Sequence, residues 1–283
     1  MKQFLLIGIS ALLLLTSCEK TDNEVFFKIG STLEYRFSDI ELYDTSTHIL
    51  YFKSVHDEFN TIEKTTFTFM ANGESIYSGA FWPAYSSFLP SEPFISTAPF
   101  QYGNYALEIQ KGFSDKPDIR KDPRLIAILK DHNLLHSGLA ISASSIEITG
   151  SNLTYSFTVT NHDQTDLLII DPDKTGPGLF HYFTNGLYIH DMNHSEVFSS
   201  TIEFQRPVPW DSWKAEWLSE LKAGDSKQFI INYPINTPLD KGEYYATFGF
   251  PGLSFQVSKD QLFQGNNRIF LGEIQVTKKI TIP

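Results

Sequence analysis

Alternation of apolar and polar side chains constrains the fold of this 283-residue chain more than any other feature of its sequence. The pattern is clearest over residues 152–160, where the apolar side chains are Leu153, Tyr155, Phe157 and Val159. In an extended strand this spacing places them all on one face. Comparable stretches recur at residues 33–37, 49–55, 67–69, 105–109, 229–233 and 244–250. Short strands separated by turns predict an all-β, mainly antiparallel fold built from β-sandwiches.

The N-terminus has the features of a secretory signal. Lys2 precedes an apolar stretch over residues 4–15, which is too short to span a bilayer as a helix. The residues Leu15-Thr16-Ser17-Cys18 resemble the lipobox of Gram-negative bacterial lipoproteins, in which the chain is cut before the cysteine and the cysteine is acylated. The resemblance implies lipidation of Cys18 and anchoring in the cell envelope, expected at the outer membrane and facing the periplasm or the surface. A soluble secreted protein is the alternative.

Two short helices are expected within the β-rich background. Asp122 followed by Pro123 is typical of an N-cap and a first helical position, and Gly138 is a natural stop. The second helix is expected over residues 211–221.

The expected second helix carries an aromatic stripe. Trp210, Trp213 and Trp217 recur with the spacing of one helix face, which Leu218 and Leu221 continue. The leucines favour a face packed on the core, because an exposed stripe would form a large apolar patch. The alternative is a platform for sugar rings or an anchor for a protein partner.

The organisation of the chain follows from these elements. Residues 1–17 are expected to form the signal peptide and residues 18–30 a lipidated tether. The small polar residues after Gly138 favour a boundary between an N-terminal β-rich domain, residues 31–138, and a C-terminal β-sandwich, residues 139–283. One continuous domain is the alternative.

Charge limits the classes of partner. Removal of residues 1–17 would take one lysine from 22 basic side chains and leave all 33 acidic ones, for a formal charge of −12. Nucleic acids and anionic lipid head groups are poor partners for that balance. With Cys18 acylated no thiol remains for a disulfide, so the fold rests on its apolar core.

The C-terminal half contains two short motifs beside its strands. Leu221-Lys222-Ala223-Gly224-Asp225-Ser226 and Gly242-Glu243-Tyr244 resemble elements of the immunoglobulin-like β-sandwich of the bacterial intracellular proteinase inhibitor type. The resemblance implies an immunoglobulin-like fold for this half. It bears on fold more than on inhibition, because many accessory domains share the pattern.

Motifs for catalysis or cofactors are missing from the sequence. There is no Gly-x-Ser-x-Gly, no glycine-rich phosphate loop after a strand, no His-Glu-x-x-His and no Cys-x-x-Cys. No cofactor is therefore expected.

Two weak metal candidates remain. His181, His190 and His194 lie near Asp191, but the sequence around them predicts a strand, a turn and a strand, which favours surface histidines on a hairpin.

The second weak metal candidate is the pair Asp171 and Asp173. With Gly176 they have the spacing that begins a calcium loop, yet Tyr182 occupies the position of the closing acid. An ordinary turn is favoured here.

Residues 79–94 form an aromatic segment with three prolines and no regular periodicity. Its large side chains include Phe81, Trp82, Tyr85 and Phe88. Such a segment is either packed down as a lid or presented to a ligand.

These observations favour a non-enzymatic, lipid-anchored module that binds a protein or a glycan through its aromatic residues. One alternative is a secreted hydrolase whose carboxylates converge between the domains, since such carboxylates need no linear motif. Another is a proteinase inhibitor. The oligomeric state and the identity of the ligand stay open.

Overall fold

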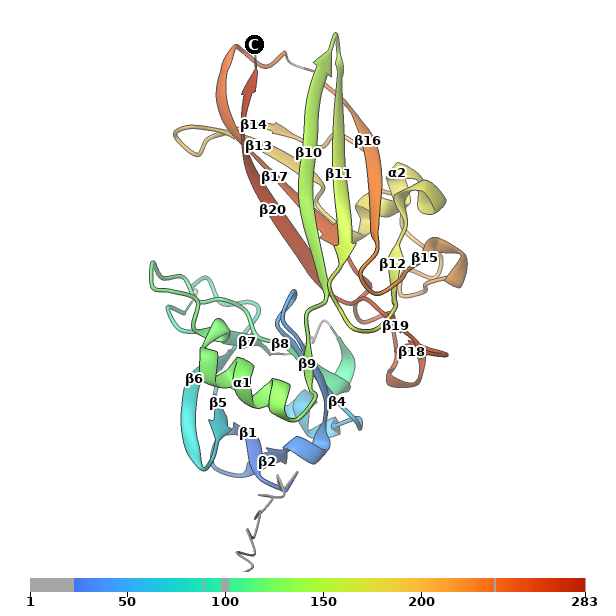
Figure 1. Cartoon of the computed structure of the whole chain (residues 1–283). Helices are drawn as coiled ribbons and strands as arrows, with labels where there is room; N and C mark the ends of the chain where they lie inside the picture. The colour runs from blue at the N-terminus through green and yellow to red at the C-terminus, as the bar shows by residue number, and fades with distance from the viewer. Residues whose placement is uncertain (1–22, 89, 98–101, 237, 283) are drawn as a thin grey trace, which may run out of the picture.

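The computed structural model describes residues 23–88, 90–97, 102–236 and 238–282 (Figure 1). The lipobox and Cys18 lie outside these residues. The described part of the chain is all-β, as the alternation predicts, with two α-helices among its strands. Figure 1 shows a C-terminal sandwich above a smaller N-terminal region.

The N-terminal region contains two sheets and one helix. The first sheet has the order β2-β1-β5-β6-β7 and the second the order β8-β4-β3-β9. Alternate side chains of the first sheet point into a core of phenylalanine and tyrosine rings, among them Phe27, Phe67 and Phe69. The elements are β1 (Val25–Ile29), β2 (Leu33–Arg36), β3 (Ile40–Asp44), β4 (Ile49–Phe52), β5 (Thr66–Ala71), β6 (Glu74–Trp82), β7 (Phe94–Ser96), β8 (Ala106–Glu108), α1 (Pro123–Asp131) and β9 (Leu135–His136).

The C-terminal region is a sandwich with a small third sheet beside it. One layer has the order β10-β11-β16, the other the order β14-β13-β17-β20, and the small sheet the order β15-β12-β19-β18. The elements are β10 (Leu139–Thr149), β11 (Asn152–Asn161), β12 (Leu167–Ile170), α2 (Pro172–Phe183), β13 (Leu187–Asp191), β14 (Glu196–Ser199), β15 (Leu218–Leu221), β16 (Ser226–Pro234), β17 (Gly242–Pro251), β18 (Phe263–Gln264), β19 (Asn267–Ile269) and β20 (Glu273–Ile282).

Most strand pairs are antiparallel, as predicted. Within the described residues, the parallel pairs are β3 with β9, β6 with β7, and β12 with β19. The alternating stretch at residues 152–160 is β11, whose four apolar side chains are buried in the sandwich.

The first predicted helix is confirmed as α1. The Asp122 side chain accepts a hydrogen bond from the Arg124 N–H at 2.8 Å, and Pro123 occupies the first turn. The helix ends at Asp131, earlier than the predicted stop at Gly138, because β9 pairs with β3 before the glycine is reached. Gly138 instead has a positive φ of 62°, and a Cβ there would lie 2.1 Å from Ser46 Oγ.

The prediction of a helix over residues 211–221 is wrong. This stretch forms a turn, a single 3-10 turn over Ala215–Trp217, and the strand β15. The strand forms because β15 pairs antiparallel with the buried strand β12, placing Leu218 opposite Ile170. Backbone pairing with a neighbouring strand thus overrides the helical spacing of the tryptophans.

The second helix, α2, lies where a turn was expected. Asp171 is its N-cap and accepts a hydrogen bond from the Asp173 N–H at 2.9 Å. The helix is broken at Gly176, which has a φ of 70° and precedes Pro177. The turn residues therefore interrupt a helix that continues to Phe183.

The two regions share an apolar core. One cluster of buried side chains lies entirely within the N-terminal region. The other fills the sandwich but also contains six side chains from the N-terminal region, Leu42, Ile49, Tyr51, Tyr102, Tyr105 and Ala106. The chain passes from one region to the other between His136 and Leu139. Whether residues 31–138 and 139–283 are independent domains stays a prediction.

Candidate functional site

The three tryptophans of the predicted stripe do not share a helix face. Trp217 is buried, Trp213 is half-buried and Trp210 is 55% exposed. Neither a core stripe nor a continuous platform describes this arrangement. Of the three, Trp210 is the most exposed.

The aromatic segment over residues 79–94 also divides into buried and exposed parts. Phe81 is buried within β6, while Tyr85 and Phe88 are 88% and 78% exposed. Trp82 is half-buried, and its Nε1–H donates to the Phe88 carbonyl at 2.7 Å. The Nζ of Lys64 lies 4.6 Å from the centroid of a Trp82 ring. Within its described residues the segment therefore packs inward through Phe81 and Trp82 and exposes the rings of Tyr85 and Phe88.

Two of the three histidine candidates, His190 and His194, lie on a hairpin, as expected, whereas His181 is buried in α2, where its ring nitrogens contact the Pro177 carbonyl and the Tyr233 hydroxyl. His190 belongs to β13, and His194 is in the turn before β14 with a φ of 64°. The Asp191 side chain accepts backbone N–H groups of Asn193 and Ser195 at 2.8 and 2.9 Å. The carboxylate therefore stabilises the turn. Within the described residues, no group of three or more His, Cys, Asp and Glu side chains is arranged to hold a metal ion.

Asp171 has protein partners on both of its carboxylate oxygens. Besides capping α2 it accepts hydrogen bonds from Ser219 Oγ and, at 2.6 Å, from Lys227 Nζ. Burial would raise the pKa of this carboxyl, but the hydrogen bonds from Lys227 and Ser219 lower it. Asp173 is 4.0 Å from Lys227 Nζ. A lysine thus occupies the position that a cation would need.

A cavity of about 370 Å³ lies between the two regions. One side comes from the N-terminal region around β8, and the other from the end of α2, the loop after β17 and the start of β20. Its lining is aromatic and polar: Tyr102, Glu108, Gln110, Tyr182, Phe183, Gly252, Leu253, Ser254, Phe255, Gln256, Gly272 and Glu273. Ligand sites often lie where two parts of a protein meet, and they combine aromatic side chains with a few polar groups that fix the orientation of the ligand.

Two carboxylates, one from each region, face this cavity. Glu108 accepts a hydrogen bond from the Tyr102 hydroxyl at 3.3 Å. Burial raises the pKa of Glu108, and the nearby charge of Glu273 adds to this effect. Glu273 accepts hydrogen bonds from Thr184 Oγ1 at 3.1 Å and from Gln275 Nε2 at 2.7 Å.

An aromatic ledge, made of Tyr182, Phe204, Trp210 and Phe255, continues from the cavity. Tyr182 and Phe255 line the cavity itself. The rings of Trp210 and Phe255 have centroids 5.2 Å apart, and those of Tyr182 and Phe204 lie 6.4 Å apart. The Tyr182 hydroxyl donates to the Trp210 carbonyl at 3.1 Å. The ledge therefore joins one candidate from the sequence, Trp210, to the cavity.

A buried charge cluster fixes the two sides of the cavity relative to each other. Arg268 of β19 is fully buried, and its Nη2 contacts Asp44 at 2.7 Å and Asp163 at 2.9 Å. The other oxygen of Asp163 lies 2.7 Å from His136 Nδ1. Burial would raise the pKa of Asp163, but His136 and Arg268 lower it to about 2.

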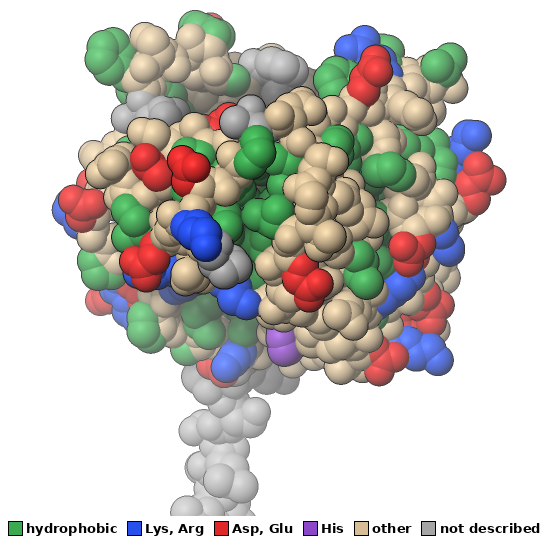
Figure 2. Space-filling view, turned by 90° about the horizontal axis from the view of Figure 1, so that it is seen from above, with side chains coloured by type: hydrophobic (Ala, Val, Ile, Leu, Met, Phe, Trp, Pro, Cys, Tyr) green, Lys and Arg blue, Asp and Glu red, His purple; other side chains and the backbone are tan. Residues whose placement is uncertain are grey.

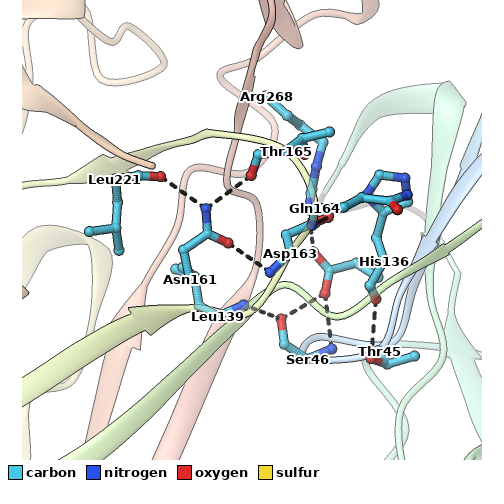
Figure 3. Close-up of polar contacts among 11 residues, drawn as sticks. Thr45, Ser46, His136, Leu139, Asn161, Asp163, Gln164, Thr165, Leu221 and Arg268 are labelled. Atoms are coloured by element: carbon cyan, nitrogen blue, oxygen red, sulfur yellow. Dashed lines mark hydrogen bonds and ion pairs between the residues drawn. The ribbon is translucent and has the colours of Figure 1, made fainter. Parts of the chain in front are cut away.

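Neutral hydrogen bonds surround this cluster. Ser46 Oγ accepts from the Leu139 N–H at 3.2 Å, across the passage between the regions. Asn161 donates to the Thr165 and Leu221 carbonyls, both at 2.9 Å, which holds the end of β15 (Figure 3). These contacts lie at the junction, so they position the cavity without lining it.

The carboxylates of the cavity were not identified from the sequence. Glu108 and Glu273 are far apart in the chain, and each lies in an ordinary alternating stretch. The expectation of carboxylates converging between the domains named no residues. No local signal marks these two, since only the packing of the two regions brings them to one cavity.

Comparison with known proteins yields little. The chain matches no protein-family model and no characterised protein by sequence. Two structures of the β-glucosidase from Kluyveromyces marxianus, one with glucose and one selenomethionine-labelled, align with 51% and 50% of this chain at 12% and 14% identity. The aligned part is 14% of the β-glucosidase chain, and the TM-score is 0.22 in both cases. Neither fold nor function follows from so low a score. None of the described helices is both long and apolar enough to cross a membrane.

Proposed function

We propose that this protein is a non-enzymatic lipoprotein of the cell envelope that binds a glycan in the cavity between its two regions. The observation that carries the proposal is the continuity of a polar cavity with an exposed aromatic ledge. The lipobox motif supports anchoring through Cys18, in the outer membrane and facing the periplasm or the surface.

The chemistry of the lining suits a sugar. Hydroxyl groups of a pyranose can donate to Glu108 and Glu273, and can exchange hydrogen bonds with the side-chain amides of Gln110 and Gln256. The apolar face of a sugar ring can lie against Trp210, which has a rigid, half-exposed ring. A site of this kind fixes orientation with polar groups and gains affinity from the aromatic surface.

The test compares two aromatic surfaces of the same protein. The double variant with Trp210→Ala and Phe255→Ala is expected to weaken binding of an oligosaccharide by roughly tenfold or more, measured by titration calorimetry. The matched control is the variant with Tyr85→Ala and Phe88→Ala on the outer segment, which should bind as the wild type does. Loss of binding in the control alone would move the site to the segment over residues 79–94.

The anchor has its own test. Cys18→Ser should move the protein from the membrane fraction to the soluble fraction, and mass spectrometry of the native protein should find acyl chains on Cys18. An unmodified thiol in the native protein would refute lipid anchoring and would leave the proposal of a glycan site unaffected.

A glycoside hydrolase is the second candidate. It is favoured by the presence of a carboxyl group with a raised pKa, Glu108, in the same cavity as a second carboxylate, Glu273. Oligosaccharides incubated with the protein would then yield new reducing ends, and Glu108→Gln would abolish them. We expect binding without cleavage.

A further inference from the structure

The charges around the cavity are unbalanced. Two glutamates face it, and no Lys, Arg or His is among its lining residues. The cation that acts on Glu108 is Arg120, which lowers the pKa of that carboxyl from outside the lining. Its guanidinium binds Asp118 through Nε at 2.8 Å and Nη2 at 2.7 Å, and Nη1 donates to the Ile109 carbonyl. Arg120 is therefore already paired.

The hydrogen-bond partners of the two glutamates are neutral. Tyr102 donates to Glu108, while Thr184 and Gln275 donate to Glu273. Neutral donors satisfy oxygen lone pairs but leave the negative charge in place. Two like charges in a half-enclosed site disfavour one another, and an opposite charge between them would remove that penalty.

The cavity differs in this respect from the general surface. On the face seen in Figure 2, acidic and basic side chains are interspersed. The cavity lining has two acidic side chains and no basic one. Four of its other residues are aromatic: Tyr102, Tyr182, Phe183 and Phe255. Faces of aromatic rings attract cations as well as apolar groups.

We propose that the glycan bound in this cavity carries a protonated amino group, which is placed between Glu108 and Glu273. This inference rests on the proposed function and narrows it from glycans in general to those containing an amino sugar that is not acetylated. The ammonium group donates to both carboxylates, and the ring of the same sugar extends toward Phe255 and Trp210 on the ledge.

The experiment uses three tetrasaccharides with the same β-1,4-linked backbone. They are the oligomers of glucose, N-acetylglucosamine and glucosamine, which carry a hydroxyl, a neutral amide and an ammonium group on the same carbon. Titration calorimetry at pH 6 should give the glucosamine tetramer at least roughly tenfold tighter binding than the other two, as a charge-assisted hydrogen bond predicts.

Variants separate the cavity from the overall acidity of the protein. Glu108→Gln and Glu273→Gln should each remove most of the preference for the amino tetramer. The control is Glu147→Gln, which removes an exposed carboxylate from β10 and should leave the preference unchanged. Equal losses in the control would assign the preference to non-specific attraction and overturn the inference.

The outcomes also distinguish this inference from the proposed function. Equal binding of all three tetramers to the wild type would overturn the amino-sugar inference and leave glycan binding standing. Absence of binding for all three would overturn both. The wild-type series decides this even if a glutamine variant folds poorly.

Discussion

At the junction between the two regions, Arg268 is expected to contribute more to the stability of the protein than any charged residue on the surface. It is fully buried, and both of its partners, Asp44 and Asp163, are fully buried as well. Removing one member of such a cluster leaves the remaining charges without compensation in a site that water does not reach. Arg268→Met should therefore lower the free energy of unfolding by about 3–5 kcal/mol, measured by urea titration.

Its control is Lys259→Met, which also breaks an ion pair between the regions. Lys259 Nζ lies 3.1 Å from Glu41, and both side chains are partly exposed to water. A pair of this kind contributes no more than about 1 kcal/mol. Equal losses in the two variants would show that burial of the Arg268 cluster has no special effect.

His48 is expected to make the free energy of unfolding depend on pH under mildly acidic conditions. It is buried, with Nδ1 2.9 Å from the Tyr43 hydroxyl, and burial together with the charge of Arg120 lowers its pKa from 6.5 to about 4. Between these two values the unfolded chain binds the proton and the folded protein does not. The free energy of unfolding therefore falls as the pH drops from 6.5 to 4, by up to roughly 3 kcal/mol from this group.

The variant His48→Asn isolates this contribution. Asparagine tolerates the positive φ of 57° at this position and does not titrate. The difference in unfolding free energy between wild type and variant should shrink or reverse as the pH falls from 7 to 4, followed by urea titration at each pH. Asp163 does not confuse the comparison, because it is present in both proteins and its pKa is about 2. A difference that is constant with pH would contradict the prediction.

At the scale of elements, the two helices begin with the same dipeptide, Asp-Pro, and only one was predicted. Asp122-Pro123 is followed by an uninterrupted apolar pattern, whereas Asp171-Pro172 is followed within a few residues by Gly176 and Pro177. Because Gly176 and Pro177 are typical of a turn, the N-cap at Asp171 was not predicted. At residues 211–221, by contrast, a helix was predicted where the strand β15 forms. The helical spacing of the tryptophans carries no information about the neighbouring strand.

The two N-caps should differ in their contribution to stability. Asp122→Ala removes a half-buried cap whose ion-pair partner, Arg124, is exposed to water, and is expected to cost about 1 kcal/mol. Asp171→Ala removes a buried carboxylate that also accepts hydrogen bonds from Ser219 and from the partly exposed Lys227, so its cost should be about 2–4 kcal/mol. Thermal unfolding of both variants provides the measurement, and equal shifts would mean that the contacts of Asp171 beyond the cap are not stabilising.

At the scale of the whole molecule, local patterns predicted the sheets but not how the regions meet. The strands β11, β16 and β17 lie where the alternation of apolar and polar side chains placed them. The approach of Glu108 to Glu273 depends instead on contacts across the junction. One of these is the hydrogen bond from the Tyr105 hydroxyl to the Val257 carbonyl at 2.7 Å. Contacts between residues so far apart in the chain produce no periodic pattern in a single sequence.

The shared core makes a prediction about the boundary at residue 138. Six N-terminal side chains, including Ile49, Tyr51 and Tyr105, complete the core of the sandwich, so a fragment over residues 139–283 would expose apolar surface that they cover. The fragment should be far less stable than the same residues in the longer chain, and the longer chain should unfold in one transition.

Tryptophan fluorescence can follow the sandwich alone. In the variant Trp82→Phe the remaining tryptophans, Trp210, Trp213 and Trp217, all belong to the C-terminal region. Their unfolding midpoint in urea should coincide with the midpoint from far-ultraviolet circular dichroism, which reports on the strands of both regions. Two separate midpoints, or a fragment over residues 139–283 as stable as the longer chain, would mean that the regions are independent domains. The cavity between them would then open and close with their relative motion, because the junction would no longer be part of one cooperative core.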